Sequence, residues 1–172
     1  MRLRTRSCLL IWCMVFALLG AALPLAASED VHAVTTDDGI TLKMLRYRPS
    51  PEAPFREGAQ TVLLFHGILC NMNVYLEHTP EENKKHYAKI VLPSPLAAWA
   101  LNDPFIKADP LRYYSLAHYL WLKGYDVWLA NFRGMGRGEL KSERGSTLHA
   151  NDAWGVLDVD PCVKTVIAAT GI

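Results

Sequence analysis

The sequence predicts an α/β fold in which a β-hairpin is followed by alternating strands and helices. The apolar run of residues 61–65, which does not alternate with polar residues, is typical of a strand buried on both faces of a parallel sheet, and residues 125–130 are predicted to form a second buried strand. An Asp-Pro pair stands where each of two helices is expected to begin, at residues 109–110 and 160–161. The order hairpin, strand, helix, strand, helix predicts right-handed crossovers between parallel strands.

Length and composition fit a single globular domain. The 172 residues are 51% hydrophobic and 20% charged, which allows a packed core and excludes a disordered chain. The net charge is +1, and the basic residues are scattered instead of clustered between aromatic residues. Nucleic acid is therefore not expected as a partner.

The first 28 residues are predicted to be a signal peptide. Three arginines lie within the first six residues, and an apolar stretch without charge follows until Glu29. Small residues after this stretch favour cleavage near Ala27 or Ser28. Because about 20 apolar residues can also cross a bilayer, an uncleaved membrane anchor is the alternative. We expect a secreted or periplasmic domain made of residues 29–172.

The hairpin is predicted over residues 31–36 and 40–47. Asp37-Asp38-Gly39 lies between the two strands, and Asp-Gly supplies the positive φ that a tight turn needs. Prolines at positions 49, 51 and 54 are expected to end the hairpin in a loop.

Helical spacing predicts the two helices that follow. After Asp109-Pro110, the residues Leu116, Tyr119 and Leu120 recur at three- and four-residue spacing, and Gly124 suits a C-terminal cap. After Asp160-Pro161 we expect one helix face to be apolar and Gly171 to end the helix. That face comprises Val163, Val166 and Ile167.

Residues 76–108 form a connection far longer than is usual in this class. Its first part, residues 81–86, is polar and predicts a solvated surface, whereas residues 90–101 are largely apolar. Both a lid over the site and a short extra helix over the sheet are consistent with this composition. Cys70 and Cys162 are the cysteines outside the leader; two buried thiols are expected, with a disulfide as the alternative.

The segment that indicates chemistry is His66-Gly67-Ile68-Leu69, directly after the first apolar strand. Open α/β sheets bind ligands at the carboxyl ends of their strands. Gly67 is expected to let the chain turn tightly, so that the amide of Ile68 or Leu69 faces the site. Such an amide can stabilise the oxyanion of an acyl-transfer intermediate. The alternative is an ordinary turn in which His66 is hydrogen-bonded into the loop.

Several segments together resemble the acid-lipase branch of the α/β-hydrolases. The hairpin Val-Thr-Thr-Asp-Asp-Gly-Ile-Thr-Leu of residues 34–42 is similar to the family's opening pattern, and residues 61–69 to its oxyanion strand and loop. The strongest likeness is Gly-Tyr-Asp-Val-Trp-Leu-Ala-Asn-Phe-Arg-Gly at residues 124–134, after the helical Ser-Leu-Ala-His-Tyr-Leu of residues 115–120. Residues 160–171 resemble the helix before the family's nucleophile strand, so the likeness covers residues 31–172.

The resemblance implies the amino-terminal portion of an α/β-hydrolase fold and the front part of a secreted serine carboxylic-ester hydrolase, a lipase or esterase. It implies a lipid or other ester as substrate of the full-length parent, contact with a membrane or lipid surface, and no cofactor or metal. It assigns the backbone amides of Ile68 and Leu69 to the oxyanion hole. The residues implied to shape or brace the surrounding loops are His66, Gly67, Asn131 and Arg133.

The sequence contains no nucleophile in the frame that this fold uses, Gly-x-Ser-x-Gly. Ser146 follows Gly145, but Leu148 occupies the position of the second glycine. In this fold the acid and the histidine follow the serine, so none of the six histidines is expected to be the catalytic base. The chain ends where the nucleophile strand is expected to begin, and we expect truncation and no useful ester hydrolysis from this polypeptide.

Two alternatives remain open: a non-catalytic binding protein of the same fold, and an acyltransferase that shares this front portion. In the strand order of the family that the sequence resembles, residues 61–65 pair with the nucleophile strand. Without that strand, residues 61–65 would form an apolar edge strand with unpaired backbone groups. Residues 29–172 alone are therefore expected to be insoluble or molten.

Other site types are not supported by the spacing. Residues 134–138 contain three glycines, but Glu139 stands where a dinucleotide-binding loop needs its third glycine. The histidines and cysteines lack metal-ligand spacing. Four tryptophans are expected to pack in the interior: Trp99, Trp121, Trp128 and Trp154.

Overall fold

A computed structural model of the chain describes residues 29–49, 60–76, 85, 90–145 and 153–172. The expected leader, the prolines at positions 51 and 54 and most of the polar run of residues 81–86 lie outside these residues. In the described ranges, no helix is both long enough and apolar enough to cross a bilayer.

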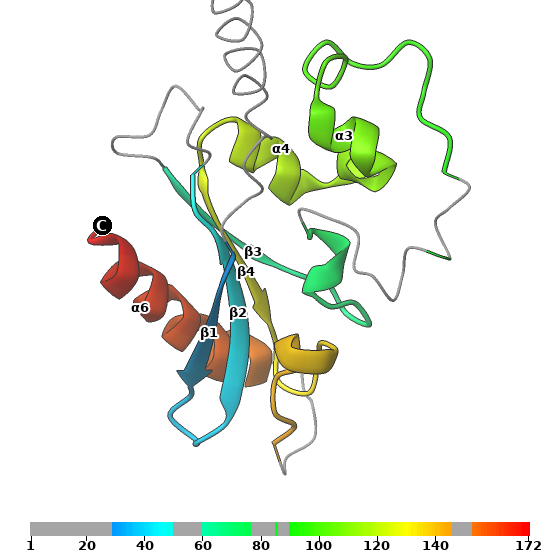
Figure 1. Ribbon diagram of the computed structural model, residues 1–172. Coiled ribbons are helices and arrows are strands. Elements are labelled where there is room, and N and C mark those ends of the chain that lie inside the picture. Colours follow the sequence, from blue (N-terminus) through cyan, green and yellow to red (C-terminus); the bar gives the residue numbers. More distant parts are fainter. Residues whose placement is uncertain (1–28, 50–59, 77–84, 86–89, 146–152) are drawn as a thin grey trace, which may run out of the picture.

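The described strands form one mixed sheet (Figure 1). Its order is β1-β2-β4-β3, with β1 antiparallel to β2, β2 antiparallel to β4, and β3 parallel to β4. The strands are β1 (Glu29–Thr35), β2 (Thr41–Tyr47), β3 (Thr61–Phe65) and β4 (Asp126–Asn131). The expected hairpin and the expected parallel pair are both present, and the α/β class is confirmed.

The β1–β2 turn is built as the sequence indicates. Gly39 adopts a φ of 80°, in the left-handed region that glycine enters without a steric penalty. Thr36 closes the turn, because its N–H donates to the Ile40 carbonyl at 2.9 Å and its side chain accepts the Ile40 N–H at 3.0 Å. These contacts fix the position of Asp38 in the turn, where its carboxylate is available to pair with a cation.

Helices cover both faces of the sheet. On one face, Leu45 of β2 and Leu129 of β4 pack with Trp121 of α4 (Leu116–Leu122). On the other face, Met44 and Trp128 pack with α6 (Val159–Thr170). Successive residues of a strand point to opposite faces, which explains how β2 and β4 contribute to both clusters.

The helix expected from residue 110 is divided into two. Pro110–Tyr114 is a 3₁₀ helix, η2, and Asp109 caps it by accepting the Leu111 N–H at 3.3 Å. The α-helix α4 begins after Ser115, whose hydroxyl accepts the His118 N–H at 3.0 Å and donates to the Leu76 carbonyl at 2.6 Å. Ser115, and not Asp109, is thus the N-cap of the α-helix.

The spacing of apolar residues predicted the two helices but did not identify the side of each helix that is buried. In α4 the buried residues are Ala117, His118 and Trp121, while Leu116 and Tyr119 are exposed. Apolar residues occur on more than one side of this helix, so their spacing alone could not identify the side that meets the sheet.

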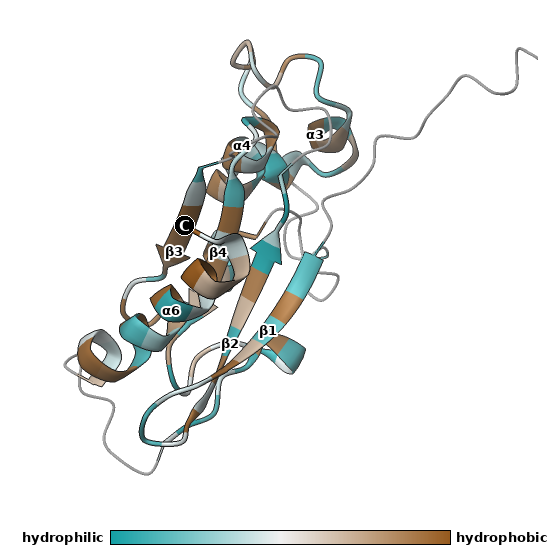
Figure 2. Ribbon diagram, turned by 90° about the vertical axis from the view of Figure 1, so that its left-hand side faces the viewer, coloured by the Kyte–Doolittle hydropathy of each residue, from teal (hydrophilic) through white to brown (hydrophobic). Residues whose placement is uncertain are grey.

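In α6 the buried residues are Cys162 and Val166, while Val163 and Ile167 are exposed. Brown and teal residues alternate along α6 in Figure 2. The helix begins before Asp160, because a π-helical turn, η4 (Trp154–Asp158), precedes it. Gly171 ends the helix with a φ of 74°, as predicted.

Strand β3 is only half-buried along its whole length, which corrects the expectation of burial on both faces. The reason is its place in the sheet: among the described strands β3 pairs only with β4 and forms an edge. Its other edge presents backbone groups that are not paired within the described sheet.

The long connection contributes a short helix, α3 (Pro104–Ala108). Asp103 caps this helix by accepting the Phe105 N–H at 2.8 Å, and its second carboxylate oxygen lies 2.8 Å from His118 Nε2. Phe105 packs edge-on against Trp121 at 5.5 Å. A short extra helix is therefore present, but it packs against α4 through Phe105 and not directly over the sheet. The expected lid falls largely on residues outside the described ranges.

Candidate functional site

The turn after β3 lies at the carboxyl ends of the two parallel strands, as the sequence indicates. The Cys70 N–H donates to the Gly67 carbonyl at 3.2 Å and closes the turn. Leu69 has a φ of 64°, a left-handed conformation that is unusual for a residue with a side chain. Gly67 is not left-handed, and a Cβ there would meet nothing within 4 Å, so neither the φ angle nor the space at position 67 requires glycine.

The two candidate oxyanion donors are open. The Ile68 residue is 61% exposed and Leu69 is 91% exposed. Neither backbone N–H donates a hydrogen bond to another described residue. The turn therefore presents two adjacent residues whose amides are available to an acceptor outside the described chain.

His66 joins the ends of β3 and β4. Its ring is buried, its Nδ1 lies 2.9 Å from the Gly67 carbonyl, and its Nε2 lies 3.4 Å from the Phe132 nitrogen. These partners assign a neutral ring with the proton on Nδ1, donating to Gly67 and accepting from the Phe132 N–H. Burial lowers the pKa of His66, and the Gly67 carbonyl opposes this effect only in part.

Three aromatic rings pack behind this turn. The ring of Phe132 stacks on Phe65 at 5.1 Å and on Trp154 at 5.0 Å. His66 meets the Phe132 ring edge-on at 5.1 Å and the Trp154 ring at 6.5 Å. Trp154 is buried as expected, but its place beside the turn was not predicted, because no local pattern links the start of α6 to the end of β3.

Asn131 joins the loops that follow the two parallel strands. Its Oδ1 accepts the Met72 N–H at 2.8 Å, and its Nδ2 donates to the Leu140 carbonyl at 2.7 Å. Met72 begins the 3₁₀ turn η1 (Met72–Val74), and Leu140 ends the 3₁₀ turn η3 (Gly138–Leu140). One fully buried amide thus fixes both loops relative to the end of β4.

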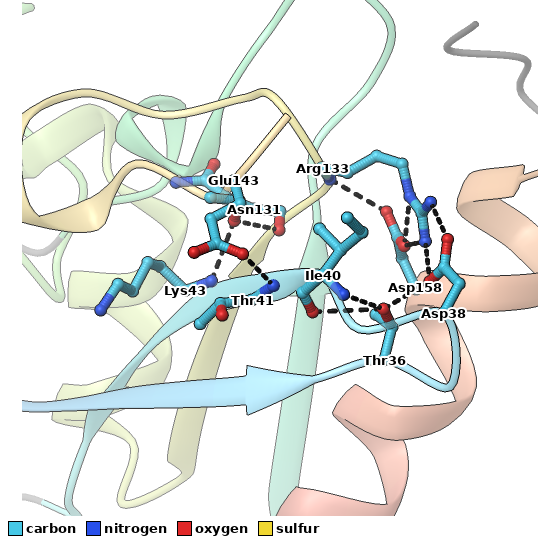
Figure 3. Close-up of polar contacts among 10 residues, drawn as sticks. Thr36, Asp38, Ile40, Thr41, Lys43, Asn131, Arg133, Glu143 and Asp158 are labelled. Atoms are coloured by element: carbon cyan, nitrogen blue, oxygen red, sulfur yellow. Dashed lines mark hydrogen bonds and ion pairs between the residues drawn. The ribbon is translucent and has the colours of Figure 1, made fainter. Parts of the chain in front are cut away.

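Arg133 connects three separate segments (Figure 3). Its Nη1 lies 2.7 Å from Asp38 Oδ2 beside the hairpin turn, and its Nε lies 2.8 Å from Asp158 Oδ1 at the start of α6. The Arg133 backbone N–H also donates to Asp158 Oδ2 at 2.9 Å. The side chains of Arg133 and Asp158 are completely buried.

The charges in this ion cluster stabilise one another. The hydrogen bond from Arg133, helped by that from Thr36, lowers the pKa of Asp38 to about 2. The pKa of Arg133 is raised, first by Asp38 and then by Asp158. The sequence did not predict the partners of Arg133. Asp38 was assigned only to the hairpin turn, and no local pattern marks Asp158 as the partner of a buried arginine.

The loop after Arg133 folds back onto β2 (Figure 3). Glu143 accepts the Thr41 N–H at 2.8 Å, which lowers the pKa of Glu143, and its own N–H donates to the Thr41 carbonyl at 2.8 Å. Ser142 accepts the Lys43 N–H at 2.9 Å and donates to the Asn131 carbonyl at 2.8 Å. The site is therefore held by backbone and buried polar contacts on its hairpin side.

No metal centre forms in the part of the chain that the structure describes. Cys70 and Cys162 are both free, so the expected thiols are present; Cys162 is buried and Cys70 is half-buried. Burial raises the pKa of Cys162 to about 12, so this thiol is un-ionised at neutral pH.

Two comparisons with known proteins found no match. No protein-family model matches the chain, and no curated protein is significantly similar to it. The function of the chain is therefore inferred from its residues and their geometry.

Proposed function

We propose that this chain is the front part of a secreted serine carboxylic-ester hydrolase with an α/β-hydrolase fold, of the lipase or esterase kind. The observation that carries the proposal is the pair of open amides at Ile68 and Leu69, at the carboxyl end of β3. Donors placed there stabilise the negative charge that develops on a carbonyl oxygen during acyl transfer. Removing one such donor typically costs roughly 3–4 kcal/mol of transition-state stabilisation.

The sheet order supports this proposal. Strand β3 lies at the edge of the described sheet and runs parallel to β4. In the fold that the sequence resembles, the nucleophile strand pairs with the equivalent strand. A parallel strand added beside β3 would bring its carboxyl end, and the serine turn that follows it, next to residues 67–69. The amide after that serine would then supply a further oxyanion donor.

The packing around the turn supports the same role. His66, Asn131 and Arg133 are buried, and each fixes a loop at the carboxyl ends of β3 and β4. A donor stabilises a transition state only when it is held in place before the reaction begins. The exposed side chains of Ile68 and Leu69 would flank an ester substrate with apolar surface.

The chain as printed is expected to hydrolyse esters no faster than an oxyanion hole alone allows. Removing the nucleophile of a serine triad typically lowers the rate on the order of a million-fold. A residual acceleration of roughly 10³–10⁴ over water is typical of a site that keeps only binding and oxyanion donors.

The proposal is tested by the nucleotide sequence that follows the codon for Ile172, read in every frame. Helix α6 ends at Thr170, and a short connection and one strand should precede the serine turn. We expect Gly-x-Ser-x-Gly within about 20 codons. The product that carries this motif should be labelled by a fluorophosphonate at that serine. A genuine stop followed by unrelated sequence, or a product that resists labelling, would contradict the proposal.

A further inference from the structure

His66 links the turn of residues 66–69 to the end of β4 through a contact that depends on its protonation state. The residue is 4% exposed, its Nδ1 lies 2.9 Å from the Gly67 carbonyl oxygen, and its Nε2 lies 3.4 Å from the Phe132 nitrogen. A carbonyl can only accept a hydrogen bond, and a backbone N–H can only donate one. The ring therefore satisfies both partners only when it is neutral and carries its proton on Nδ1.

A second proton on this ring would remove the contact with the end of β4. In the imidazolium form both ring nitrogens are donors, so the Nε2–H would face the Phe132 N–H with no acceptor between them. The neighbouring side chains are aromatic: the ring lies at a steep angle to Phe132 at 5.1 Å and to Trp154 at 6.5 Å. An unmade hydrogen bond between buried groups carries the cost of their desolvation, so the protonated ring should leave this position.

Among the described residues, no carboxylate around the ring is free to act as its counter-charge. The ionisable residues on the segments that pack around it, residues 66–76, 126–133 and 154–158, are Cys70, Tyr75, Asp126, Arg133 and Asp158. Both aspartates already pair with arginines, Asp126 with Arg46 and Asp158 with Arg133. A proton on His66 would thus place an uncompensated charge in the interior.

We infer that His66 is a proton-sensitive latch for the turn of residues 66–69: the neutral ring ties this turn to the end of β4, and the protonated ring releases it. The inference rests on the proposed function, because the turn carries the Ile68 and Leu69 amides assigned there to the oxyanion hole. Such donors are effective only while they are held in place. The ladder between β3 and β4 does not involve His66, so acid should release the turn without unfolding the sheet.

The direction of the pH response follows from the burial of the ring. Burial lowers the pKa of His66 in the folded chain, and the Gly67 carbonyl opposes this effect only in part. In the unfolded chain a histidine has a pKa of about 6.5, so the unfolded state binds the proton more readily. The stabilising contribution of the latch is therefore complete above about pH 6.5 and is lost as the pH falls from there toward the folded pKa.

The test follows hydrogen exchange at the Cys70 and Phe132 amides in the longer product that carries the serine motif. The Cys70 N–H closes the turn, and the Phe132 N–H donates to the latch. His66→Gln supplies a neutral acceptor that does not titrate. His32→Gln is the matched control, because His32 is a half-buried histidine on β1, at the opposite edge of the described sheet from β3. Each amide is compared between proteins at the same pH, which cancels the intrinsic effect of pH on exchange.

We expect the wild type and His66→Gln to exchange alike at about pH 7.5, where the latch is neutral. As the pH is lowered to about 4, the wild type should become about ten-fold faster than His66→Gln at both amides, the factor that corresponds to the loss of one hydrogen bond. His32→Gln should respond to acid as the wild type does. Equal exchange in the wild type and His66→Gln at every pH, or loss of the acid response in His32→Gln, would overturn the inference.

A second measurement, on the wild type, remains decisive if His66→Gln fails to fold. The ring nitrogens of isotopically labelled histidine, observed by NMR, should show a neutral His66 with its proton on Nδ1 at about pH 7.5. A proton on Nε2 at that pH would overturn the inference. Neither measurement requires catalysis, so a product that resists the fluorophosphonate yet releases the turn in acid would contradict the proposed function alone. A product that is labelled but shows no acid response would contradict the latch alone.

Discussion

Replacing Arg133 with methionine is expected to lower the free energy of unfolding by about 3–5 kcal/mol, the usual cost of removing one partner of a buried ion pair. Methionine would leave the completely buried carboxylate of Asp158 without its cation. It would also release the β1–β2 turn and the start of α6 from the loop after β4. Pulse proteolysis across a urea gradient, carried out on the longer product that carries the serine motif, measures the change.

Arg48→Ala is the matched control, because Arg48 also pairs with an aspartate, Asp30, but is largely exposed. Its loss should cost at most about 1 kcal/mol. If both variants are destabilised equally, the Arg133 cluster does not hold the three segments together.

The same cluster predicts how stability responds to acid. The folded pKa of Asp38 is about 2, below the value of about 3.9 expected in the unfolded chain. The folded state therefore binds the proton more weakly, and the contribution of Asp38 is complete above about pH 4 and is lost as the pH falls through about 2. In Arg133→Met the pKa of Asp38 should move back toward its unfolded value, and this part of the acid dependence should disappear.

Gly136→Ala is expected to destabilise the chain by about 2–5 kcal/mol, from backbone strain and steric overlap together. Gly136 has a φ of 99°, which an L side chain rarely adopts. A Cβ there would also overlap the Leu140 carbonyl oxygen and lie 2.5 Å from Asn131 Nδ2. The substitution would thus displace the two groups whose hydrogen bond fixes the loop after β4.

Gly138→Ala separates the two causes. Gly138 has a φ of 54°, but a Cβ there would meet nothing within 4 Å. Only the strain remains, roughly 1–2 kcal/mol. Urea unfolding of both variants, each made in the longer product that carries the serine motif, gives the comparison. Equal losses of unfolding free energy would contradict a steric contribution at Gly136.

The strands could be predicted because their signals are local. The Asp-Gly pair predicts the hairpin turn, and the apolar run before Asn131 predicts a strand, whatever the rest of the chain contains. Gly171 could likewise be predicted as a cap, since a left-handed residue commonly ends a helix. These elements have the predicted order and place the turn of residues 66–69 at the carboxyl ends of the parallel strands.

The features that depend on tertiary contacts could not be predicted. The buried side of α4 is set by Trp121 against the sheet, not by the apolar spacing that Leu116 and Tyr119 also satisfy. Asp158 and Trp154 reach the site through a turn of π-helix that no sequence pattern announces. At the turn itself the sequence drew attention to Gly67, whereas Leu69 is the residue in the left-handed conformation.

The most direct test of the proposed function removes the Ile68 N–H in the product that carries the serine motif. Proline at position 68 has no amide hydrogen, whereas Ile68→Ala keeps the hydrogen and removes most of the side chain. We predict that Ile68→Pro lowers kcat for ester hydrolysis by roughly 10²–10³ with little change in KM, and that Ile68→Ala stays close to wild type. An unchanged kcat in Ile68→Pro, or an equal loss in both variants, would contradict the assignment of this amide to the oxyanion hole.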